Sequence, residues 1–201
     1  MHLKILIIGH SWARDIYQRI TNNIDKEGIT VEFSVYYIPG GKVQDFILND
    51  KIINYIYDIN PNLVYFFVGG NDFQIGQDLS KVKEDIVSLF NAYESNFPNI
   101  TFIMSEVEYR QVTHINRHNT PLVEEFKSKA NNFNRWLKNK KLSRSLVKIT
   151  HSLGPGPNDF KSDGVHLNSS GIDKVIQNLK FNIKKLIEDK IISDYIPPLN
   201  C

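Results

Sequence analysis

The sequence contains very little cysteine: one residue, Cys201, at the end of 201 residues. A single thiol cannot form a disulfide within the chain, so folding does not depend on an oxidising compartment. Long apolar runs are also missing. The apolar run near the N-terminus ends at Gly9, whereas a membrane helix needs about 18 apolar residues. We therefore expect a soluble, intracellular protein without a signal peptide or a transmembrane segment.

The sequence also has almost no net charge, because 24 Lys and Arg oppose 22 Asp and Glu for a balance of +2. Nucleic-acid-binding domains usually carry a clear positive excess, which disfavours nucleic acid as a partner. With 41% hydrophobic residues, the chain is too apolar for a disordered protein. It contains no phosphate-binding loop of the Gly-x-x-x-x-Gly-Lys type and no histidines and carboxylates at metal-ligand spacing. We expect neither a cofactor nor a metal.

Apolar and amphipathic segments alternate along the whole chain. Short apolar runs predict strands at residues 3–8, 31–38, 63–68, 100–104 and 146–149. Apolar residues at helical spacing predict helices at residues 13–24, 43–56, 79–93, 122–137 and 172–186. Strands that alternate with helices are typical of βαβ units, so we expect an α/β protein, a three-layer α/β/α sandwich around a mainly parallel five-stranded sheet. A single domain would span residues 1–190, followed by a tail at 191–201.

Polar residues suited to catalysis follow the ends of the predicted strands. Ser11 follows the first strand, and Asp163 and His166 lie in the loop before the last helix. Because the carboxyl ends of parallel strands share one edge of a sheet, we expect these residues to meet there. A serine hydroxyl becomes a nucleophile when an imidazole takes its proton, and a carboxylate on the other ring nitrogen orients that imidazole. The sequence thus predicts Ser11, Asp163 and His166 as catalytic residues.

The same edge offers hydrogen-bond donors for a developing oxyanion. The candidates are the backbone N–H groups of Ser11 and Gly41 and the side-chain amide of Asn71. Loss of one such donor typically raises the barrier by about 3–4 kcal/mol. Glycine suits position 41 if the substrate approaches the backbone closely there. Further residues near this edge are candidates for substrate binding: His10, Gly40, Asp72, Arg110 and His114.

These motifs resemble the four sequence blocks of the SGNH (GDSL-type) hydrolases. The matching residues are Gly9-His10-Ser11, Gly41, Gly70-Asn71-Asp72 and Asp163-x-x-His166, in the family's order and over nearly the whole chain. The resemblance implies a flavodoxin-like fold and a serine esterase or acyl-transfer mechanism. It implies Ser11 as the nucleophile, His166 as the base and Asp163 as its partner, with Gly41 and Asn71 in the oxyanion hole. The short motifs Gly-His-Ser, Pro-Gly-Gly and Asp-Gly-Val-His-Leu-Asn are also similar to those of SGNH-like domains in some retroelement and viral proteins.

One position departs from the family pattern, because the first block usually reads Gly-Asp-Ser and here His10 replaces the acid. The imidazole could tune Ser11, contact the substrate or only pack. Three functions stay open: hydrolysis of a small acyl (acetyl-like) ester of a carbohydrate, lipid or other alcohol; acyl transfer by the same nucleophile; and a catalytically silent binding module of a mobile-element or viral protein. His10 and a basic cluster at residues 138–144 motivate the last of these.

Overall fold

The computed structural model describes residues 2–20, 28–73, 77–108, 120–139, 147–149, 155–189 and 191–192. A single five-stranded sheet lies at its centre, in the order β2-β1-β3-β4-β5, and every neighbouring pair is parallel. Its strands are β1 (His2–Gly9), β2 (Thr30–Tyr37), β3 (Leu63–Phe67), β4 (Thr101–Ser105) and β5 (Val147–Ile149). This is the flavodoxin-like strand order, so the predicted sheet is confirmed.

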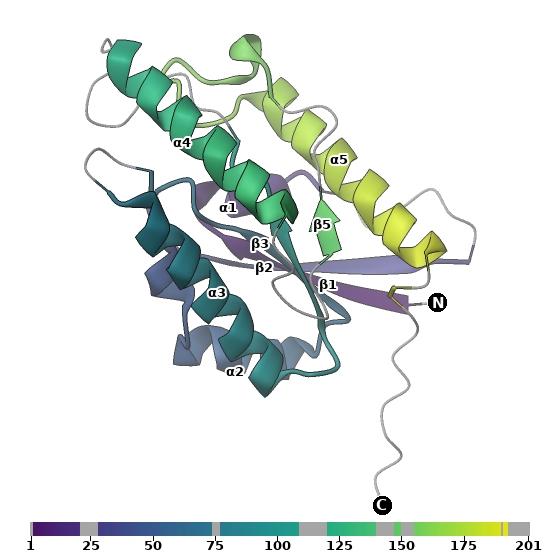
Figure 1. The fold of residues 1–201 in the computed structure, drawn as a ribbon. Helices are drawn as coiled ribbons and strands as arrows, with labels where there is room; N and C mark the ends of the chain where they lie inside the picture. The colour runs from purple at the N-terminus through teal and green to yellow at the C-terminus, as the bar shows by residue number, and fades with distance from the viewer. Residues whose placement is uncertain are drawn as a thin grey trace, which may run out of the picture.

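Helices cover both faces of the sheet (Figure 1). One face is covered by α1 (Ser11–Tyr17) and α5 (Ser169–Glu188). The other face is covered by α2 (Asp50–Ile59), α3 (Leu79–Asn96) and α4 (Thr120–Asn139). Two 3₁₀ helices, η1 (Val43–Phe46) and η2 (Pro157–Asp159), lie in the connections. The arrangement is the predicted three-layer sandwich. None of the helices among the described residues is both long enough and apolar enough to span a membrane.

The central strands are apolar throughout because both of their faces are buried. In β1, Leu6 and Ile8 pack toward α2, α3 and α4, whereas Ile5 and Ile7 pack toward α1 and α5. All five residues of β3 are buried as well. A parallel sheet between two helical layers needs this continuous apolar character rather than the alternation of a half-exposed strand.

Two of the predicted helices have different limits in the structure. The helix expected over residues 43–56 is divided into η1 and α2, because Ile47 is extended and Leu48 adopts a left-handed conformation with φ 48°. The Asn49 side chain then accepts a hydrogen bond from Lys51 N–H (3.1 Å) and starts α2. The first helix, expected at 13–24, begins at Ser11 and ends at Tyr17.

The register of the sheet brings the first three strand ends together. Gly9 pairs with Tyr37 of β2 on one side and with Phe67 of β3 on the other. A Cβ atom on Gly9 would lie 2.5 Å from the Phe67 carbonyl oxygen, so glycine permits this close approach. The chain segments that leave these three strands therefore start side by side, at the point where the order of strands reverses.

Candidate active site

His10 forms the turn between β1 and α1. Its backbone N–H donates to the Phe67 carbonyl oxygen (3.2 Å), and its ring Nδ1 accepts from Trp12 N–H (3.4 Å), which caps the helix. The side chain is buried, and its ring lies edge-on to the Trp12 indole, with centroids 5.6 Å apart. Ser11, between them, is half-buried at the first position of α1. Of the three roles left open for His10, this geometry favours capping and packing.

His166 lies on a short hairpin that precedes α5. The hairpin is closed by an antiparallel bridge between Phe160 and Leu167 and by a hydrogen bond from Lys161 N–H to the His166 carbonyl oxygen (2.7 Å). Gly164 makes the turn with φ 65°, a backbone conformation that side chains disfavour. The sequence Asp-Gly-Val-His therefore folds into a tight loop that holds His166 on its far strand.

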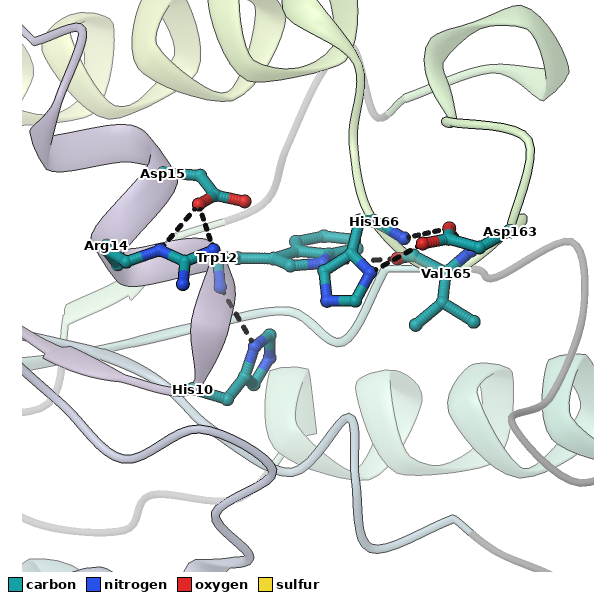
Figure 2. A network of polar contacts seen from close by, with 7 residues as sticks. All are labelled: His10, Trp12, Arg14, Asp15, Asp163, Val165 and His166. Atoms are coloured by element: carbon teal, nitrogen blue, oxygen red, sulfur yellow. Dashed lines mark hydrogen bonds and ion pairs between the residues drawn. The ribbon is translucent and has the colours of Figure 1, made fainter.

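Asp163 makes three hydrogen bonds within this hairpin. One carboxylate oxygen accepts from Val165 N–H (2.8 Å) and His166 N–H (2.9 Å), and the other lies 2.7 Å from His166 Nδ1 (Figure 2). Partial burial opposes ionisation of this carboxyl, but the hydrogen bonds from His166 and Val165 outweigh it and lower its pKa to about 2. The carboxylate is ionised at neutral pH and accepts only, so the proton of the contact belongs to Nδ1. In a neutral ring, Nε2 is then the basic nitrogen.

A hydrogen bond connects this hairpin to the start of α1. The indole Nε1 of Trp12 donates to the Val165 carbonyl oxygen (3.2 Å), across 153 positions of sequence (Figure 2). It joins the residue after Ser11 to the residue before His166. Among the residues that the structure describes, no hydrogen bond links Ser11 directly to His166. The structure thus shows a direct contact between the neighbours of the two predicted partners.

Asn71 and Asp72 brace the glycine turn that follows β2. The Asn71 side-chain amide donates to the Gly41 carbonyl oxygen (3.0 Å) and, like every primary amide, carries a second N–H. Both carboxylate oxygens of Asp72 lie 3.2 Å from Val43 N, which donates to them. Asp72 is 3% exposed, and burial raises its pKa to about 7 despite the hydrogen bond from Val43. Its contacts place Asp72 in the support of the turn rather than on its open side.

In the turn after β2, the Gly41 N–H makes a hydrogen bond that the sequence did not indicate. The N–H donates to the Ile38 carbonyl oxygen (3.0 Å), and Gly40 has φ 70°. A Cβ atom on Gly41 would lie 2.9 Å from the Phe46 ring. Packing against Phe46, rather than substrate approach, is therefore what requires glycine here.

Asp159, which sequence reasoning missed, fixes the base of the hairpin that carries His166. This buried carboxylate accepts from Lys174 Nζ (2.6 Å), Gly156 N–H (2.6 Å) and the Ser170 hydroxyl (2.9 Å). The hydrogen bond from Lys174 is the main cause of its lowered pKa. The sequence gives one indication of this supporting role, an acid shortly before the predicted helix start at residues 168–170.

A small cavity of about 20 Å³ lies beside the start of α1. It is lined by both sequence neighbours of Ser11, His10 and Trp12, and by Glu106 and Glu108 after β4. Burial, and secondarily the charge of Glu106, raises the pKa of Glu108 to about 8. Sequence reasoning did not identify these two acids.

Several predicted residues lie outside the described part of the chain. These are Arg110 and His114, together with most of the basic cluster. Lys138, the described member of that cluster, forms an ion pair with Glu106 (2.9 Å). Within the ranges that the structure describes, no group of three or more His, Cys, Asp or Glu side chains forms a metal-binding arrangement.

Comparisons with known proteins agree with this architecture. A family model described as GDSL-like Lipase/Acylhydrolase matches residues 8–179. An acetyl esterase mutant solved with an acetate ion is similar in structure, with a TM-score of 0.65, 16% identity and coverage of 94% of this chain and 99% of that chain. A family 3 carbohydrate esterase from Clostridium thermocellum gives a TM-score of 0.66, 15% identity and coverage of 94% and 98%. A GDSL-like lipase from Bacteroides thetaiotaomicron gives a TM-score of 0.62 and 19% identity, with coverage of 90% of this chain and 88% of that chain.

At these identities, the similar structures show the fold alone. No curated protein matches the sequence. The family match and the similar structures give no support to the further similarity to retroelement and viral proteins.

Proposed function

Because the chain belongs to the GDSL-like lipase/acylhydrolase family, we propose that it is a serine esterase with Ser11, His166 and Asp163 as its catalytic residues. The observation that carries the proposal is the 2.7 Å contact between His166 Nδ1 and an ionised Asp163, on a hairpin tied to the start of α1. An imidazole held in this tautomer presents a basic Nε2, which is what a serine nucleophile requires.

In the first half of the reaction, His166 Nε2 takes the proton of the Ser11 hydroxyl while Ser11 Oγ attacks the ester carbonyl carbon. The charge of Asp163, against Nδ1, stabilises the imidazolium that forms. The tetrahedral intermediate then collapses: the bond to the alcohol oxygen breaks, the imidazolium protonates the leaving alcohol, and an acyl-Ser11 ester remains.

In the second half, water repeats the same steps. His166 Nε2 takes a proton from water, the hydroxide equivalent attacks the acyl carbon, and Ser11 leaves with the proton from the imidazolium. The products are a carboxylic acid and the free enzyme. Acyl transfer would differ only by an alcohol acceptor in place of water, and product analysis with added alcohols separates the two.

For the oxyanion, we propose Ser11 N–H and the side-chain amide of Asn71 as donors. The Gly41 carbonyl oxygen orients the amide of Asn71, which supports this role. The Gly41 N–H, first predicted as a third donor, would have to leave the Ile38 carbonyl oxygen to join them. Because each donor contributes about 3–4 kcal/mol at the transition state, a site with two is still an effective one.

The substrate that fits best is a short acyl ester, such as an acetyl ester, of a hydroxylated alcohol. The cavity beside Trp12 has about 20 Å³, room for about one water molecule, which suits a methyl group rather than a long chain. An open hollow of about 430 Å³ lies at the glycine turn after β2, and its lining includes the polar residues Gln44, Asp45 and Asn49. A carbohydrate or another polar alcohol would be accommodated there.

Labelling with a fluorophosphonate tests the nucleophile without knowledge of the natural substrate. We expect stoichiometric labelling of the wild type and of Ser80→Ala, which alters an exposed serine on α3, and no labelling of Ser11→Ala. Hydrolysis of nitrophenyl acetate should follow the same pattern and decrease as the acyl chain lengthens. If wild type and Ser11→Ala are equally inactive with both reagents, the proposal is refuted and the catalytically silent module is favoured; equal activity would refute Ser11 as the nucleophile.

A further inference from the structure

A second hollow, of about 160 Å³, lies at the opposite edge of the sheet from Ser11. Its walls are two equivalent connections, one at Asn60-Pro61 between α2 and β3 and one at residues 96–100 between α3 and β4. Both connections lead into the amino ends of their strands, whereas Ser11 follows a carboxyl end. Figure 1 shows the two helices that end there lying on the same face of the sheet. No step of the proposed hydrolysis involves this hollow.

The floor of the hollow is apolar and its rim carries an exposed aromatic ring. Ile56, Phe97 and Ile100 are buried beneath it. Tyr57 is 61% exposed, yet its ring is held against Phe97 with centroids 4.8 Å apart and an interplanar angle of 57°. A tyrosine supported in this way presents a rigid apolar surface to solvent and loses little entropy when a ligand covers it.

Amide groups supply the polar part of the rim. The side chains of Asn60 and Asn99 have no hydrogen-bond partner among the residues that the structure describes. Asn96 donates from Nδ2 to the Ala92 carbonyl oxygen (2.7 Å), which leaves its amide oxygen as an acceptor. Each asparagine amide has two N–H donors and one accepting oxygen, so the rim can both donate and accept. None of the residues that line the hollow is charged.

We propose that this hollow is a non-catalytic binding site for a neutral sugar residue of a glycan chain. A sugar ring has an apolar face of C–H groups, which can lie on Tyr57, and hydroxyls that both donate and accept, as the asparagine amides do. A phosphate or a carboxylate would need cations, which this lining lacks. The volume of about 160 Å³ is below the ~300–1,000 Å³ of pockets for drug-sized ligands, which suits one ring.

Native electrophoresis in gels that contain xylan, hydroxyethylcellulose or dextran measures this binding directly. We expect at least one of these neutral polysaccharides to slow the wild type and Tyr57→Ala to lose at least tenfold in affinity for it. Tyr57→Trp should retain binding, which shows that position 57 acts through its ring. The matched control is Phe181→Ala, which removes an aromatic ring of α5 with 62% exposure, and it should bind like the wild type.

The outcomes separate this site from the catalytic one. Ser11→Ala should bind the polysaccharide normally, and Tyr57→Ala should hydrolyse a small soluble ester at the wild-type rate. Thus a failure of the esterase proposal leaves the binding result intact. The inference is overturned if none of the three gels slows the wild type, or if Tyr57→Ala is slowed as much as the wild type.

Discussion

Replacement of Asp163 by asparagine separates the two tasks of this carboxylate. One oxygen holds the hairpin through Val165 N–H and His166 N–H, and the other fixes the imidazole of His166. In Asp163→Asn, the amide oxygen can still accept from the two backbone N–H groups, while the NH₂ group faces Nδ1. The ring must then accept at Nδ1 and carry its proton on Nε2, which removes the base for Ser11. In Asp163→Ala, both tasks are lost.

The magnitudes differ enough to distinguish these cases. The same Asp→Asn change in a chymotrypsin-type triad lowers kcat by about 10⁴, and we expect a loss of about 10³–10⁴ here. For stability, the pKa of about 2 against an unfolded value near 3.9 would correspond to about 2.6 kcal/mol. Because the side chain is 32% exposed, solvent screening reduces this to about 1–2 kcal/mol. Asp163→Asn, which cannot ionise, should therefore lower Tm by about 2–8 °C, and Asp163→Ala by more, because it also leaves Val165 N–H and His166 N–H without their acceptor.

The assays are nitrophenyl acetate kinetics and thermal unfolding of wild type, Asp163→Asn and Asp163→Ala. The stabilisation by Asp163 belongs to its ionised form, because the folded pKa is depressed. It is complete above the unfolded pKa near 4 and disappears as the pH falls through about 2. The Tm difference between Asp163→Ala and wild type should therefore shrink toward pH 2. A kcat loss in Asp163→Asn below tenfold, with an intact fold, would refute the assigned tautomer and the role of Asp163.

Three further predictions concern the supports of the site. Trp12→Phe removes the donor to the Val165 carbonyl oxygen, so we expect the free energy of unfolding measured in urea to fall by about 1–3 kcal/mol. We also expect kcat to fall by a larger factor than KM changes. Asp72 has a pKa of about 7, above its unfolded value, so the free energy of unfolding of the wild type should fall by up to about 4 kcal/mol as pH rises from 4 to 7. Asp72→Asn should lack this dependence of stability on pH. An equal dependence in both proteins would contradict the burial argument. His10→Ala removes the acceptor for Trp12 N–H, so we expect its free energy of unfolding in urea to fall by about 0.5–2 kcal/mol, whereas His10→Asn should retain most of it; equal stability of wild type and His10→Ala would contradict the capping role.

The sequence predicted the sheet well because its strands are buried on both faces and thus continuously apolar. Position 48 shows where such reasoning stops: the left-handed Leu48 divides the expected helix, and the Asn49 side chain then caps a new one. Likewise, Asp163 and His166 could be paired from their spacing in a loop. Their link to Ser11 through Trp12 and Val165 could not, because a hydrogen bond across 153 positions leaves no local pattern.

His10 illustrates how a family motif can change without loss of the proposed chemistry. What position 10 provides is an acceptor for Trp12 N–H at the first turn of α1, and an unprotonated imidazole nitrogen offers one as an aspartate oxygen does. The acid that contacts the proposed base His166 lies elsewhere, at Asp163, so the first block needs no carboxylate for the proposed triad. The exchange has one chemical consequence. An aspartate brings a negative charge with its accepting oxygens, whereas a neutral imidazole accepts at Nδ1 without a charge, so the cap at the start of α1 is kept and the charge is not.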